Sequence, residues 1–80
     1  MSEKIFLSDL PVGCSGRIFK IEPCPSEERL KELGFTAGSK VAVLHKNIGG
    51  SACAYYIKGA VIALRKDESK NIIVGEDYYV

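Results

Sequence analysis

The sequence lacks the features that mark secreted, membrane-spanning or strongly charged proteins. No apolar run approaches the ~20 residues of a membrane span, and residues 1–7 have neither a long apolar stretch nor a small-residue cleavage site. The 80 residues include 11 basic and 10 acidic side chains, so the net charge of +1 gives no strong field to attract nucleic acid. We therefore expect one cytoplasmic domain over residues 1–80, with a core at about 7–75 and a tail at 76–80. It should neither insert into a membrane nor bind nucleic acid.

Cysteine and histidine are scarce. The three cysteines, Cys14, Cys24 and Cys53, are an odd number without a C-x-x-C pair, whereas a disulfide-framed domain would carry an even set. With His45 they are candidate ligands for a transition metal, but no two have ligand-pair spacing. If Lys46 lies opposite Cys53 in a hairpin, His45 points to the other face. We predict no metal cofactor, and we keep a transition-metal-binding or metal-sensing domain as the alternative function.

A catalytic set is not evident either. Such a set needs a nucleophile with a base, or two carboxylates brought together. The only histidine stands alone, Glu27 and Glu28 suit the start of a helix, and Asp67 and Glu68 suit a turn. The glycine-rich residues 47–51 indicate a hairpin tip, because neither a Lys-Ser or Lys-Thr pair nor a helix follows them. We predict that the protein is not an enzyme.

The sequence does contain clear periodic segments. Leu30 and Leu33 lie three apart on one helical face, Ser26 suits the N-cap and Gly34 suits the left-handed C′ position, which predicts a helix over about 27–33. Residues 8–11 resemble a helical turn capped by Ser8, and residues 67–70 indicate a polar turn or a single helical turn. Strands are predicted at 14–22, 40–46, 53–58, 60–66 and 71–75. About five short strands around one short helix indicate a mainly β fold, a small β-barrel.

Four tyrosines come as two adjacent pairs, Tyr55-Tyr56 and Tyr78-Tyr79. In a strand, one of Tyr55 and Tyr56 must face inward and the other outward. The exposed member could stack on a base, but the weak net charge favours rim packing or protein contact instead.

Four further segments are informative together, at residues 7–13, 16–21, 29–41 and 62–74. They occur in the order found in FeoA, the small ferrous iron transport protein A, and the chain resembles that family over about residues 7–74. The resemblance implies an SH3-like β-barrel of about five strands with the short helix inserted after the first strand. It also implies a cytoplasmic accessory of the ferrous iron permease FeoB, whose cytosolic part is a G-protein domain. A similar domain ends DtxR-type repressors, but no helix-turn-helix precedes the barrel here.

Together, the resemblance and the missing catalytic set favour a protein-interaction module that binds and regulates the permease, as a monomer or weak homo-oligomer. The helix, its glycine exit and the nearby strands are the expected contact region. The candidate partner-binding residues are Glu28, Lys31, Glu32, Gly34, Phe35 and Lys58, whereas Leu30, Leu33 and Val43 are expected in the core. Whether the module activates, inhibits or stabilises the transporter is left open by the sequence.

Overall fold

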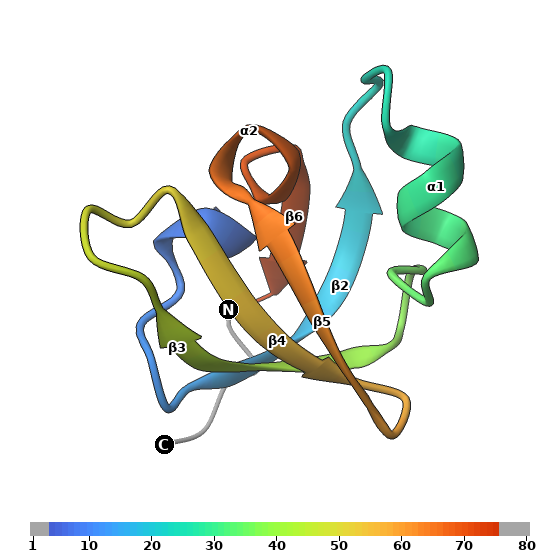
Figure 1. Cartoon of the computed structure of the whole chain (residues 1–80). Coiled ribbons are helices and arrows are strands. Elements are labelled where there is room, and N and C mark those ends of the chain that lie inside the picture. Colours follow the sequence, from blue (N-terminus) through green and yellow to red (C-terminus); the bar gives the residue numbers. More distant parts are fainter. Residues whose placement is uncertain (1–3, 76–80) are drawn as a thin grey trace.

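The computed structural model describes residues 4–75, which form one curled antiparallel sheet with two short α-helices (Figure 1). The strands follow the order β1-β6-β2-β3-β4-β5 across the sheet. The elements in chain order are β1 Lys4–Phe6, the 3₁₀ turn η1 Leu7–Asp9, β2 Ser15–Ile21, α1 Glu27–Glu32, β3 Lys40–Lys46, β4 Ala52–Ile57, β5 Ala60–Arg65, α2 Lys66–Ser69 and β6 Ile72–Gly75. The predicted tail at 76–80 lies outside the described residues.

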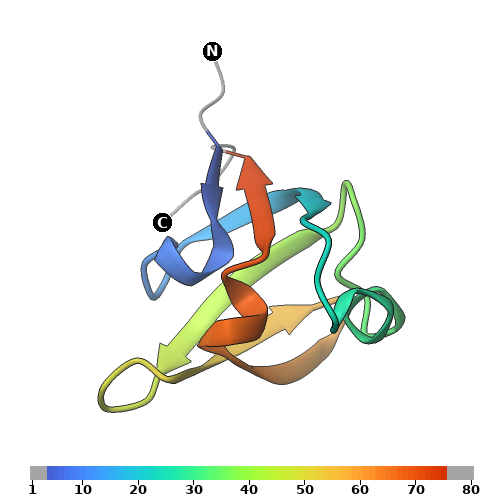
Figure 2. The same ribbon diagram turned by 90° about the horizontal axis from the view of Figure 1, so that it is seen from above.

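Strand β2 curls the sheet because it changes partners along its length. Its first part pairs with β3 from Ser15 to Arg17, and its second part pairs with β6 from Ile18 to Ile21. A register shift between Ile18 and Lys20 marks a bulge, the kind of irregularity that bends a strand. Viewed from above, α1 lies at one side of the curled sheet, and α2 links β5 to β6 (Figure 2).

Two details of the predicted barrel are wrong. Within residues 4–75 the sheet has six strands rather than about five, because the three-residue β1 is too short to show alternation in the sequence. Helix α1 therefore follows the second strand rather than the first. The sheet is also unclosed: β1 and β5 stand at its two ends and do not pair with each other. Strand β1 forms only because β6 supplies its hydrogen-bond partners, with Ile5 opposite Val74.

Most of the other predicted elements are confirmed. Strand β3 spans Lys40–Lys46 as expected, and its hairpin with β4 places Lys46 opposite Cys53. In β4, Tyr55 is buried and Tyr56 is exposed, as strand alternation requires. The two predicted side-chain caps are absent, however: Ser26 precedes α1 without a capping hydrogen bond, and Ser8 lies inside η1.

Helix α1 ends as its glycine predicts. Gly34 has φ +111°, its N–H donates to the Lys31 carbonyl at 3.0 Å, and the Phe35 N–H donates to the Leu30 carbonyl at 3.0 Å. This pair of bonds is the Schellman motif, which closes a helix on a left-handed residue. The turn directs the chain inward at Phe35, so that a helix of only six residues is anchored to the sheet by its own exit.

The core lies inside the curl of the sheet. Phe35 meets Tyr55 edge to face, with ring centroids 6.3 Å apart and an interplanar angle of 87°. Burial of each large apolar side chain contributes about 1.5–3 kcal/mol, so a core of this size is enough to hold α1 in place. The fully buried large side chains are Leu7, Leu10, Leu30, Phe35, Val41, Val43, Tyr55, Ile57, Leu64, Ile72 and Val74.

Candidate protein-interaction site

The outer surface of α1 presents a small mixed-charge patch, here called the α1 face and made of Glu28, Lys31 and Glu32. All three side chains are exposed, as the sequence predicted. Lys31 Nζ lies 3.0 Å from Glu27 Oε2, and the hydrogen bond to Glu27 raises the pKa of Lys31. The α1 face therefore displays one cation between two anions, on a helix whose opposite side is anchored through Leu30.

Two further predicted residues, Gly34 and Lys58, are brought together beside the α1 face. The Lys58 side chain passes over Gly34 so closely that a Cβ at Gly34 would lie 3.3 Å from Lys58 Cδ. Lys58 Nζ continues to Thr36 and donates to its Oγ1 at 3.3 Å. The turn between β4 and β5 is thus tied to the exit of α1, and the ammonium group of Lys58 stays exposed.

Phe35 was predicted as a partner-binding residue, and the structure corrects this prediction. Its side chain is fully buried, so it is not part of the exposed surface of α1. The Schellman turn directs the residue after Gly34 into the core, where Phe35 packs on Tyr55. Of the three residues expected in the core, Leu30 and Val43 are buried and Leu33 is half-buried against the core cluster.

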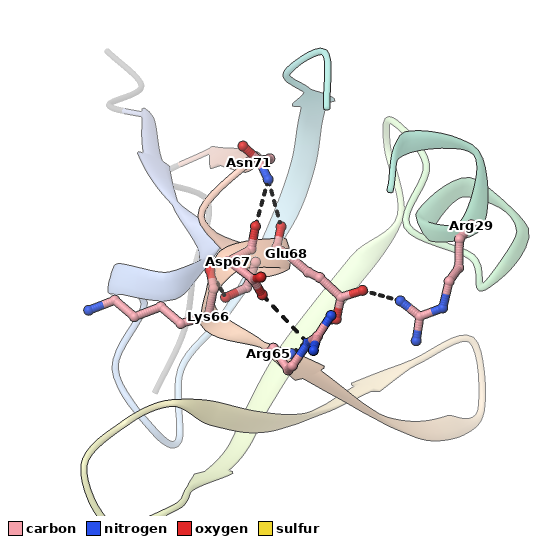
Figure 3. Close-up of polar contacts among 7 residues, drawn as sticks. Arg29, Arg65, Lys66, Asp67, Glu68 and Asn71 are labelled. Carbon is pink, nitrogen blue, oxygen red and sulfur yellow. Dashed lines mark hydrogen bonds and ion pairs between the residues drawn. The ribbon is translucent and has the colours of Figure 1, made fainter. Parts of the chain in front are cut away.

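Sequence reasoning missed the most buried carboxylate of the described residues. Glu68 is only 6% exposed and forms an ion pair with Arg29 Nη1, which links α2 to α1 (Figure 3). Its Oε1 also accepts the Arg65 backbone N–H at 3.1 Å. This bond is half of a capping box, because Glu68 is the third residue of α2. The N-cap residue Arg65 is not Ser or Thr, so the usual sequence pattern for this motif is missing.

Two hollows flank α1. One, of about 460 Å³, lies between α1 and β5 and includes the Arg29–Glu68 pair; its lining residues are Ser26, Arg29, Ala52, Ala63, Leu64, Arg65 and Glu68. The other, of about 220 Å³, lies beside the α1 face; its lining residues are Lys20, Ile21, Glu27, Lys31, Phe35, Thr36 and Ala37. The helix is therefore bordered by concave surface on both sides.

The candidate metal ligands remain separate side chains. Cys14 and Cys53 are buried in the core cluster, Cys24 is half-buried at its edge, and His45 is exposed. Within residues 4–75, no group of three or more His, Cys, Asp or Glu side chains could hold a metal ion. Over the same residues, no helix is both long and apolar enough to cross a membrane.

Solved structures define the class of this fold as SH3-like. The crystal structure of Stenotrophomonas maltophilia FeoA complexed with zinc, described as a prokaryotic SH3 domain protein, matches with a TM-score of 0.83 and 27% identity, covering 94% of this chain and 95% of that chain. Iron(II) transport protein A from Clostridium thermocellum matches with a TM-score of 0.82 and 30% identity, covering 88% of this chain and 44% of that chain. A FeoA-like protein from Clostridium acetobutylicum matches with a TM-score of 0.84 and 24% identity, covering 92% of this chain and 87% of that chain.

The family model for the FeoA domain matches residues 5–76, and the chain therefore belongs to the FeoA family. This confirms the resemblance seen in the sequence and extends it to β1. A comparison with curated proteins gave no match.

Proposed function

We propose that this protein is a cytoplasmic accessory of ferrous iron uptake that binds and regulates the cytosolic G-protein domain of the permease FeoB. The observation that carries the proposal is the FeoA domain match over residues 5–76. Two relatives support it by description: the Stenotrophomonas protein as a candidate activating factor for ferrous iron transport, and the Clostridium thermocellum protein as iron(II) transport protein A. In this proposal the protein acts by binding rather than by catalysis, and ferrous iron is the cargo of its partner.

The surface chemistry around α1 supports a docking role. Glu28, Lys31 and Glu32 are exposed on a helix held from behind by Leu30, so their positions are set before a partner arrives. A preorganised charged patch steers encounter and selects orientation more than it adds affinity. Lys58, tied to Thr36, extends the patch onto the β4–β5 turn. We assign the FeoB contact to the α1 face together with Gly34 and Lys58.

The proposal is tested by NMR titration of the ¹⁵N-labelled full chain with the permease's cytosolic domain, without nucleotide, with GDP and with a non-hydrolysable GTP analogue. We expect amide shifts concentrated at Glu28, Lys31, Glu32, Gly34 and Lys58, with an affinity that depends on the nucleotide. Unchanged spectra at a large excess of the partner in all three nucleotide states would refute the proposal. Shifts confined to β1 and β6 would retain FeoB binding but move it away from α1.

A further inference from the structure

Strand β5 leaves one side of its backbone without a strand partner among residues 4–75. It is an end strand of the sheet and pairs only with β4, from Ala60 opposite Ile57 to Arg65 opposite Ala52. Exposed end strands are templates for pairing with another extended chain. The edge is apolar, since Val61 is 65% exposed and Ala63 is also exposed.

The register shows which backbone groups are free on this edge. In an antiparallel pair, hydrogen-bonded and non-hydrogen-bonded residues alternate. The Lys66 N–H donates to the Ser51 carbonyl at 2.9 Å, and this pair continues the register of the β4–β5 ladder. Counting back from Lys66 in steps of two, the residues that hydrogen-bond to β4 are Leu64, Ile62 and Ala60. The turn agrees, because a two-residue hairpin of Lys58 and Gly59, both with positive φ, requires Ala60 and Ile57 to be a bonded pair. The N–H and C=O groups of Val61 and Ala63 therefore point away from the sheet.

Glu68 occupies the next position along the same edge. The Arg65 N–H, which alternation also directs outward, donates to Glu68 Oε1 at 3.1 Å. The carboxylate thus stands where the carbonyl of an added strand would stand, and it closes the edge at the α2 end. Two residues, Val61 and Ala63, remain open for pairing between this closed end and the β4–β5 turn.

The free edge borders the 460 Å³ cleft, whose charge indicates what could bind. Ala63 and Arg65 of β5 form one wall, and Arg29 of α1 contributes to the other together with Ser26, which precedes the helix. The lining includes two arginines and one carboxylate, and both oxygens of that carboxylate are engaged, by Arg29 and by the Arg65 N–H. The side chain of Arg29 is still 55% exposed, so its guanidinium has donors free to meet an anion. The cleft therefore complements a negative group.

We infer that the β5 edge binds an extended peptide segment that adds a strand through Val61 and Ala63 and places an acidic side chain at Arg29. Main-chain bonds supply affinity in such strand addition, and the side-chain position supplies selection. A single extended segment suits the space because α1 walls the cleft opposite β5, whereas the edge of a second copy would bring its own sheet into that wall. The inference concerns a site apart from the α1 face and does not depend on FeoB as the partner.

The test uses the ¹⁵N-labelled full chain and a capped synthetic nonapeptide of alternating threonine and valine with one central glutamate. We expect amide shifts and slowed hydrogen exchange at Val61 and Ala63, with smaller shifts at Arg29. A peptide with glutamine in place of the glutamate should bind about fivefold more weakly. Ala63→Pro removes the free donor without touching the ladder to β4, and it should weaken binding about tenfold. Ala63→Thr keeps the donor and should bind more tightly than Ala63→Pro.

The outcomes separate this inference from its rivals. Protection of the Val61 and Ala63 amides before any peptide is added would overturn it, because another part of the chain or a second copy then covers the edge. Equal binding of the glutamate and glutamine peptides would overturn the acidic selection at Arg29. Equal binding to the Ala63→Pro and Ala63→Thr proteins, both checked as folded by unchanged amide shifts in β2 and β6, would overturn strand addition.

Discussion

Arg29 of α1 and Glu68 of α2 form an ion pair across 39 residues of sequence, and the two side chains are unequally buried. The Glu68 side chain is 8% exposed, whereas the Arg29 side chain is 55% exposed. Loss of the arginine would leave a buried carboxylate without its ion-pair partner, whereas loss of the glutamate would leave an arginine that water can solvate. The pair joins two short helices, of six and four residues, neither of which is stable alone.

Arg29→Ala is therefore predicted to destabilise the fold more than a half-exposed arginine usually does, by about 1–3 kcal/mol. The reason is that Glu68 keeps only the Arg65 N–H as a partner. Adding Glu68→Gln to Arg29→Ala should recover part of the loss, because a neutral amide costs less to bury than an unpaired charge. Urea unfolding of the four proteins measures the coupling, and additive losses would contradict the prediction.

Gly34→Ala and Gly38→Ala should each lower the free energy of unfolding by about 1–2 kcal/mol, because both glycines have left-handed φ, +111° and +89°. They differ in surroundings: a Cβ at Gly34 meets Lys58, and one at Gly38 has no neighbour within 4 Å. Only Gly34→Ala should shift the side-chain methylene signals of Lys58 in the NMR spectrum, because a Cβ at Gly34 displaces that side chain. The same shift in both variants would argue against this contact.

Lys58→Asn should raise the free energy of unfolding by about 1 kcal/mol, since Lys58 has φ +50° and asparagine before glycine is favoured in a two-residue hairpin turn. The same change removes the ammonium group proposed to contact FeoB. We expect thermal unfolding to show a more stable protein, while calorimetry shows weaker FeoB binding. Weaker binding that accompanied reduced stability would point to a folding defect instead.

Reversal of the cation on the α1 face, Lys31→Glu, should weaken FeoB binding about tenfold, because it leaves four acidic side chains, Glu27, Glu28, Glu32 and the new one, on one short helix. Lys70→Glu is the matched control, with the same charge change at an exposed residue that follows α2. Isothermal titration calorimetry at two salt concentrations measures both. Equal losses in the two variants would indicate a net-charge effect rather than a contact at α1.

Tyr55→Phe should flatten the loss of stability at alkaline pH. Among residues 4–75 the buried Tyr55 hydroxyl has no hydrogen-bond partner, and burial, together with the neighbouring Cys53, raises its pKa above the usual 10.0. The folded protein then holds this proton more tightly than the unfolded chain. The stabilisation is therefore complete below pH 10 and declines above it by up to about 1.4 kcal/mol per pH unit.

The change should also leave stability at pH 7 equal or higher, since phenylalanine removes an unsatisfied buried hydroxyl. Urea unfolding between pH 7 and 11 measures both effects. Tyr56→Phe, on the exposed side of the same strand, should retain the wild-type alkaline slope. An alkaline slope unchanged in Tyr55→Phe would show that other groups cause it.

The sequence by itself determined the local structure, because each such feature depends on neighbours in the chain. Gly34 ends α1 since only a residue without a Cβ takes its φ freely, and alternation in β4 separates the buried Tyr55 from the exposed Tyr56. The strand at 40–46 and its hairpin followed from period and turn residues. The ordered segments likewise indicated the FeoA family, which the domain match confirmed.

The tertiary structure alone decided what distant segments do to one another. Strand β1 depends on β6 for its hydrogen bonds. Phe35, which the sequence placed on the surface, is buried because the Schellman turn directs it onto Tyr55. From the sequence Glu68 is a turn residue, and only the folded chain places Arg29 of α1 beside it. Within residues 4–75, β5 has one unpaired edge because the sheet does not close onto β1. Each of these results from contacts between residues far apart in the chain, which sequence periodicity does not encode.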